Sequence, residues 1–193
     1  VSIGNGLVID QFNGFNNAML QEQGHAVGIL RAAEITAAAT NVQAFSHMLQ
    51  YQMATNFIRG GDSNVSGLSW PAFASDASGG TGGYTGGPGA LLYGSTLGIP
   101  SNVAMPSTIT TPEGKALWWT CQNYGLMMNV TGGQPNHEIA IFAENAANGM
   151  PGLGNLQTDW PRIVPFLRVL RNQGPNSING GGTPLQPILP GIH

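Results

Sequence analysis

Two glycine clusters divide the chain into parts of different character. They cover residues 79–83 (Gly-Gly-Thr-Gly-Gly) and residues 86–89 (Gly-Gly-Pro-Gly), and neither cluster can continue a regular helix. They lie in a glycine-rich excursion, residues 60–110, in which only Ala90–Tyr93 favours a short strand or turn. A stretch of this length without regular structure is uncommon inside a compact domain and is often functional.

The segments on both sides of this excursion carry apolar residues at helical spacing. In residues 6–59 apolar side chains recur every three to four positions, and the alanines at 37–39 have high helix propensity. Residues 111–173 continue the pattern, and residues 174–193 form a tail rich in proline and glycine. The pattern predicts a mainly α fold, a helical bundle of about four to five helices with the excursion at 60–110 and the extended tail.

Three helices are expected in the second half. Thr111-Pro112-Glu113 supplies a hydroxyl cap, a proline in the first turn and an acid near the positive helix end. That helix should continue through Met128 and be central, because it is apolar nearly all round. A second helix is expected from Asn136 to about Ala147, and a third should open at Asp159 and carry Arg168 near its end.

The composition bounds the class of protein. The 193 residues suit a single domain, 1–193. Charged residues make up 8% of the chain, against about 25% in a typical soluble protein. The six lysines and arginines are too few and too scattered for a nucleic-acid surface, and no apolar run reaches the ~18 residues of a membrane span.

Val1 at the start fits removal of a signal peptide, or a trimmed chain, and we expect an extracytoplasmic location (secreted, periplasmic or surface).

The sequence gives only weak indications of metal or thiol chemistry. Cys121 is the single cysteine and lies in an apolar stretch, which predicts a buried core residue. Glu22 and His25 form an ExxH pair, half of a di-iron carboxylate site, and no second pair completes it. The stretch Phe45–Gly60 (FSHMLQYQMATNFIRG) resembles secreted ferritin-like proteins, but the glutamates of that family are absent at the corresponding positions. We therefore expect no metal and no cofactor.

Candidate catalytic residues are the acids and the histidine on predicted helices. A glycan-cleaving site needs two converging carboxylates, and a general acid–base site needs its groups to share a pocket. Capping electrostatics alone explain Glu138, which lies in the first turn of its predicted helix. The candidates are Asp10, Glu34, His137, Glu138 and Glu144.

Three aromatic residues lie in polar, glycine-rich surroundings. Trp70, Tyr84 and Tyr93 are candidate contacts for a ligand or a partner, although such rings more often hold a loop on the core. Asn64 and Asn129 begin glycosylation sequons, which chance also explains in a chain rich in asparagine.

The tail and the scarcity of charge together favour assembly. Prolines 184, 187 and 190 favour an extended course that wraps the domain, reaches a partner or frays. We expect a non-enzymatic structural or assembly subunit (filament, capsid, appendage or secretion-machine component) that packs against copies of itself or other subunits. The alternatives are a secreted hydrolase of a glycan or cell-wall polymer, or a degenerate ferritin-like bundle.

Overall fold

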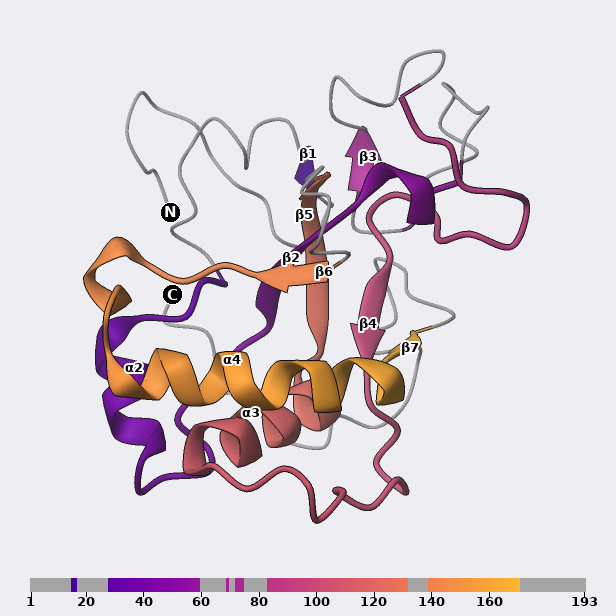
Figure 1. Ribbon diagram of the computed structural model, residues 1–193. Coiled ribbons are helices and arrows are strands. Elements are labelled where there is room, and N and C mark those ends of the chain that lie inside the picture. The colour runs from indigo at the N-terminus through magenta and orange to yellow at the C-terminus, as the bar shows by residue number, and fades with distance from the viewer. Residues whose placement is uncertain are drawn as a thin grey trace, which may run out of the picture.

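The protein has an α/β fold, so the predicted helical bundle is wrong. The computed structural model describes residues 15–16, 28–59, 69, 72–74, 83–131 and 139–170. Within these residues three α-helices and a five-stranded mixed sheet share one hydrophobic core (Figure 1). The helices are α2 (Ala32–Ala38), α3 (Pro112–Asn123) and α4 (Pro151–Ile163). The sheet strands are β2 (Leu49–Met53), β4 (Thr96–Gly98), β5 (Leu126–Thr131), β6 (Ile139–Ile141) and β7 (Arg168–Val169).

The sheet has the order β6-β2-β5-β4-β7. β2 and β5 are parallel, whereas the other three neighbouring pairs are antiparallel. Helices α3 and α4 lie side by side across one end of the strands, and β6 runs along α4 (Figure 1). The smaller elements are a parallel pair, β1 (Phe15–Asn16) with β3 (Ala72–Ala74), and the 3₁₀ turns η1 (Thr55–Phe57), η4 (Asn145–Ala147) and η5 (Val164–Phe166).

The largest error concerns residues 6–59, which were expected to be helical. In their described part, 28–59, α2 is the single α-helix and β2 is a central strand. Leu49, Tyr51 and Met53 alternate with two glutamines, and this period of two is that of a strand. The ferritin-like resemblance fails for the same reason, because Phe45–Gly60 contains β2 and not a long helix.

The start of α3 confirms the prediction, and its end corrects it. The Thr111 hydroxyl accepts a hydrogen bond from the backbone N–H of Gly114 at 3.0 Å, as an N-cap does. The helix ends at Asn123 because Gly125 has a φ of +77°, and a Cβ there would lie 2.7 Å from the Leu97 carbonyl. The chain then turns into β5, so residues up to Met128 are not helical.

The other two helices of the second half were misplaced. The segment expected to run helically to Ala147 forms β6 and η4 where the structure describes it, and Asn136 lies outside the described residues. Helix α4 begins at Pro151, eight positions before Asp159, with that proline in its first turn. Arg168 does not end the helix, because it lies in β7.

Part of the glycine-rich excursion enters the core. It supplies β4, and the rings of Tyr84 and Tyr93 are 8% and 2% exposed and stack with their centroids 5.6 Å apart. Leu91 forms one isolated β-bridge with Ile58, in line with the short strand or turn expected there. Cys121 is buried in α3, as expected, and burial raises the pKa of its thiol. The single-domain organisation of residues 1–193 stays a prediction.

A buried carboxylate joins α3 to α4. Asp159 is fully buried and accepts hydrogen bonds from the Thr111 backbone N–H at 3.0 Å, the Thr111 hydroxyl at 2.7 Å and the Arg162 guanidinium at 2.6 Å. Burial opposes ionisation, but these hydrogen bonds and the Arg162 charge outweigh it and hold the pKa of Asp159 below its ordinary value. The N-cap of α3 is therefore fixed by a side chain of α4.

Candidate functional site

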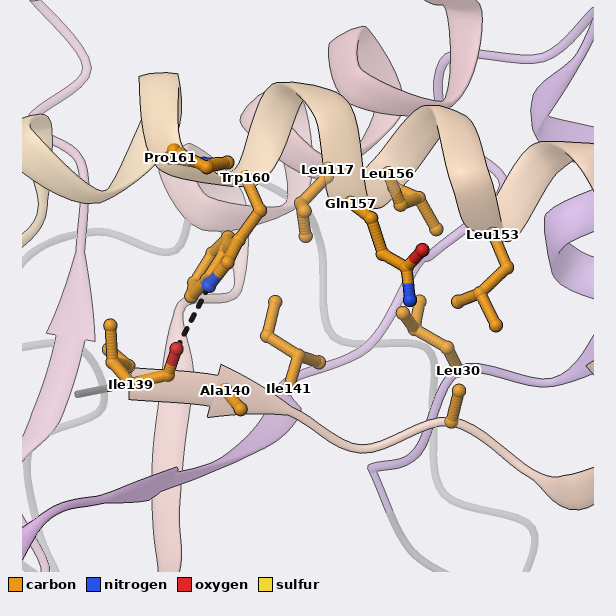
Figure 2. A pocket seen from close by; sticks show the side chains of 11 residues that line it. Leu30, Leu117, Ile139, Ala140, Ile141, Leu153, Leu156, Gln157, Trp160 and Pro161 are labelled. Atoms are coloured by element: carbon orange, nitrogen blue, oxygen red, sulfur yellow. Dashed lines mark hydrogen bonds between the residues drawn. The ribbon is translucent and has the colours of Figure 1, made fainter. Parts of the chain in front are cut away.

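An apolar groove lies between strand β6 and helix α4. Its volume is about 570 Å³, which is within the range of small-molecule pockets. Figure 2 shows Leu30 and Ile141 pointing toward α4, Leu153 and Leu156 pointing back from the helix, and Leu117 of α3 behind them. Its lining residues are Leu30, Leu117, Ile139, Ala140, Ile141, Ala143, Leu153, Leu156, Gln157, Trp160 and Pro161.

The sequence of α4 explains this lining. Leu153, Leu156, Gln157 and Trp160 recur at spacings of three and four, so they lie on one face of the helix. None of the groove-lining side chains carries a charge. The groove therefore favours an uncharged, mostly apolar occupant over a charged substrate.

Two side-chain groups give the groove its polarity. The Trp160 indole N–H donates to the Ile139 carbonyl at 3.0 Å and ties α4 to the edge strand (Figure 2). The Gln157 amide points into the groove, and it has no hydrogen-bond partner among the described residues. One amide can donate to and accept from the backbone of a bound chain segment.

The edge of β6 that faces away from β2 contributes backbone groups. The Phe142 N–H donates to the Gln50 carbonyl, so the backbone groups of Phe142 point toward β2. In an antiparallel pair the backbone groups of successive residues point alternately toward the partner strand and away from it. The backbone groups of Ile139 and Ile141 then point away from β2, and the bond from Trp160 to the Ile139 carbonyl agrees with that direction. Within the described part of the chain, Ile141 has no partner on this side, so β6 offers an open strand edge.

A second apolar cavity continues the same surface. Its volume is about 230 Å³, and Ile139 lines both cavities. Phe57 and Val169, which are 37% and 39% exposed, lie at this second cavity. Its lining residues are Met53, Phe57, Leu91, Leu97, Ile139, Val164, Leu167 and Val169. The apolar surface thus extends from Leu30 beyond the end of α4 to β7.

Two of the predicted catalytic acids meet at the start of α2. Glu34 accepts from the Arg31 backbone N–H at 3.0 Å and lies 3.0 Å from Nε2 of His47. Glu144 accepts from the Ala32 backbone N–H. These bonds satisfy backbone donors at a helix start, so both acids have a structural role there. Neither Glu34 nor Glu144 lines either of the two cavities described above.

The remaining predicted site residues fall into two groups. Tyr84 and Tyr93 are in the core, so little of either ring is open to a ligand or partner in this conformation. The others lie outside the described residues: Asp10, Glu22, His25, Trp70, His137 and Glu138. Among the residues that the structure describes, no group of three His, Cys, Asp or Glu side chains is placed to hold a metal ion. In the same residues, no helix is both long enough and apolar enough to cross a membrane.

Sequence reasoning missed the groove because it assigned its two walls to the wrong elements. β6 was expected to be helical, and α4 was expected to start at Asp159, after Leu153 and Leu156. The signal that could have found the helix wall was Pro151 followed by apolar residues at helical spacing. No protein-family model, curated protein or solved structure matches this chain.

Proposed function

We propose that the protein is a non-enzymatic structural or assembly subunit that works outside the cytoplasm and packs against copies of itself. The observation that carries this proposal is the uncharged groove beside the open edge of β6. Such an edge adds a further strand readily, and an apolar groove next to it gives that strand side-chain pockets. A filament, capsid, appendage or secretion machine uses contacts of this kind between subunits.

The charges of the described residues support the same proposal. Asp159 holds the start of α3, and Glu34 and Glu144 hold the start of α2. Glu113 is buried and accepts a hydrogen bond from the Asn155 amide at 3.0 Å, between α3 and α4. These carboxylates act within the fold, and none of them lines the groove, which supports binding rather than hydrolysis.

The first test is the oligomeric state of the purified chain. We expect light scattering coupled to gel filtration to give a mass several times the 20.1 kDa of one chain, and electron microscopy to show a regular particle or filament. Interfaces of stable assemblies bury about 1,200–2,000 Å² or more, so assembly should persist at micromolar concentration. A dispersed monomer over the whole accessible concentration range would refute the proposal.

A matched pair of variants connects assembly to the groove. Gln157→Arg places a charge in the groove, whereas Thr158→Arg places the same charge on the neighbouring exposed position of α4, which does not line it. We expect Gln157→Arg to shift the assembly toward smaller species and Thr158→Arg to leave it unchanged, with both circular dichroism spectra native. Equal effects of the two variants would mean that assembly does not use the groove.

A further inference from the structure

We infer that residues 184–192 of one copy bind in the groove between β6 and α4 of a second copy. This inference rests on the proposed function, because it names the segment that joins the subunits. The groove sets three requirements for its occupant: an apolar composition, an extended backbone, and N–H and C=O groups for the open edge of β6.

The C-terminal sequence meets the first two requirements. Residues 184–192 read Pro-Leu-Gln-Pro-Ile-Leu-Pro-Gly-Ile and contain no charged side chain. The prolines at 184, 187 and 190 exclude a helix and favour an extended backbone. A segment that is extended before binding loses less conformational entropy when it enters a groove.

The spacing of the prolines also suits a short strand edge. Proline has no backbone N–H, so donors remain at the residues between the prolines. Gln186 and Ile188 are two positions apart and therefore present their N–H groups on the same side of an extended chain. The edge of β6 likewise presents two residues, Ile139 and Ile141, on the side away from β2.

The place where the described chain ends is close to this surface. The described chain ends at Leu170, directly after Val169, which lines the second cavity. Residues 171–183 span at most about 45 Å when extended, and they include the glycines 180–182. By contrast, residues 132–138 are anchored at both ends and read Gly-Gly-Gln-Pro-Asn-His-Glu, a polar sequence that does not suit an apolar groove.

A second copy is favoured as the source of the tail, because the chain carries too little charge for copies to repel one another strongly. The formal net charge is −3 and charged residues are 8% of the chain, so electrostatic repulsion between copies is weak. The exposed apolar side chains of Phe57 and Val169 lie on the same continuous surface and gain burial when a neighbour covers them. Binding of the tail in the groove of its own chain is the competing arrangement.

Photocrosslinking of the full chain tests this inference. Leu189 is replaced by benzoylphenylalanine, ¹⁴N- and ¹⁵N-labelled preparations are mixed and allowed to exchange, and the products of irradiation are mapped by mass spectrometry. We expect crosslinks from position 189 to residues 139–141 and 153–160, and we expect labelled chains joined to unlabelled ones at the frequency of random pairing. Crosslinks within single chains alone would overturn the inference, because the tail would then occupy its own groove.

A pair of tail variants supplies the second readout. Ile188→Asp puts a carboxylate into the proposed contact, whereas Ile178→Asp makes the same change in the tail outside residues 184–192. We expect Ile188→Asp to weaken assembly roughly tenfold or more and Ile178→Asp to leave it unchanged. If the wild-type chain assembles but neither variant affects it and no crosslink reaches the groove, the inference fails while the assembly function stands. A wild-type chain that stays monomeric refutes both.

Discussion

Gly114→Ala is expected to destabilise the protein by about 2–3 kcal/mol, the cost of forcing extra atoms into a well-packed contact. A Cβ at this position would lie 2.3 Å from Oδ2 of Asp159. That oxygen cannot retreat easily, because Asp159 is fully buried and its carboxylate holds Thr111 and Arg162. The methyl group therefore pushes apart α3 and α4 at the point where they are joined.

Thermal and urea unfolding followed by circular dichroism measure this effect. For a chain of this size the melting temperature should fall by roughly 4–12 °C. Gly154→Ala is the matched control, because Gly154 lies in α4, is exposed, and has no atom within 4 Å of the added Cβ. The control should be neutral or slightly stabilising, since alanine is the better helix former by up to about 1 kcal/mol. A loss of stability in both variants would contradict the clash as the cause.

Asp159→Asn is expected to lower stability by about 2 kcal/mol at neutral pH and to flatten the dependence of stability on pH in acid. Hydrogen bonds and the Arg162 charge depress the pKa of Asp159 in the folded state. The stability that this group contributes is therefore complete above its unfolded pKa of about 3.9, and it is lost as the pH falls through the lower folded value. The gap in unfolding free energy between wild type and Asp159→Asn should shrink over that window.

Urea titrations at a series of pH values between neutral and acid measure the gap directly. Arg162→Gln separates the two causes of the shift, because it removes the ion pair and keeps both hydrogen bonds from Thr111. Arg162 is partly exposed, so this change should cost less than about 1 kcal/mol. If Arg162→Gln were as destabilising as Asp159→Asn, the ion pair within α4, rather than the bonds to Thr111 at the start of α3, would account for the stability that Asp159 contributes.

Local sequence signals of a helix start could be interpreted correctly, whereas segments whose apolar residues fit both a helix and a strand could not be assigned. The Thr111 cap was predicted because a hydroxyl residue, a proline and an acid in this order are typical of the start of a helix. The apolar residues from Leu49 to Met53 fit both a helical and a strand period. The segment is a strand because it pairs with β5 in the sheet. The end of α3 depended on the positive φ of Gly125, which the apolar run from Leu117 to Met128 concealed.

The candidate site was beyond the reach of sequence reasoning for a different reason. Its walls come from β6 and α4, and their contact depends on the placement of both against the rest of the sheet. The meeting of Glu34 with His47 and of Glu144 with Ala32 is similarly a product of tertiary structure, because the second pair is 112 positions apart. Residue types alone indicated only that charges were scarce.

Reaction of the buried Cys121 thiol with a labelling reagent can be used to measure unfolding of the protein. Burial raises the pKa of this thiol, and the thiolate is the form that reacts with alkylating and disulfide reagents. Because the chain has one cysteine, every molecule that such a reagent labels has opened its α3 core, and the labelling rate follows the population of opened molecules. A cysteine added anywhere on the surface would, conversely, be the one thiol that a probe reaches in the native state.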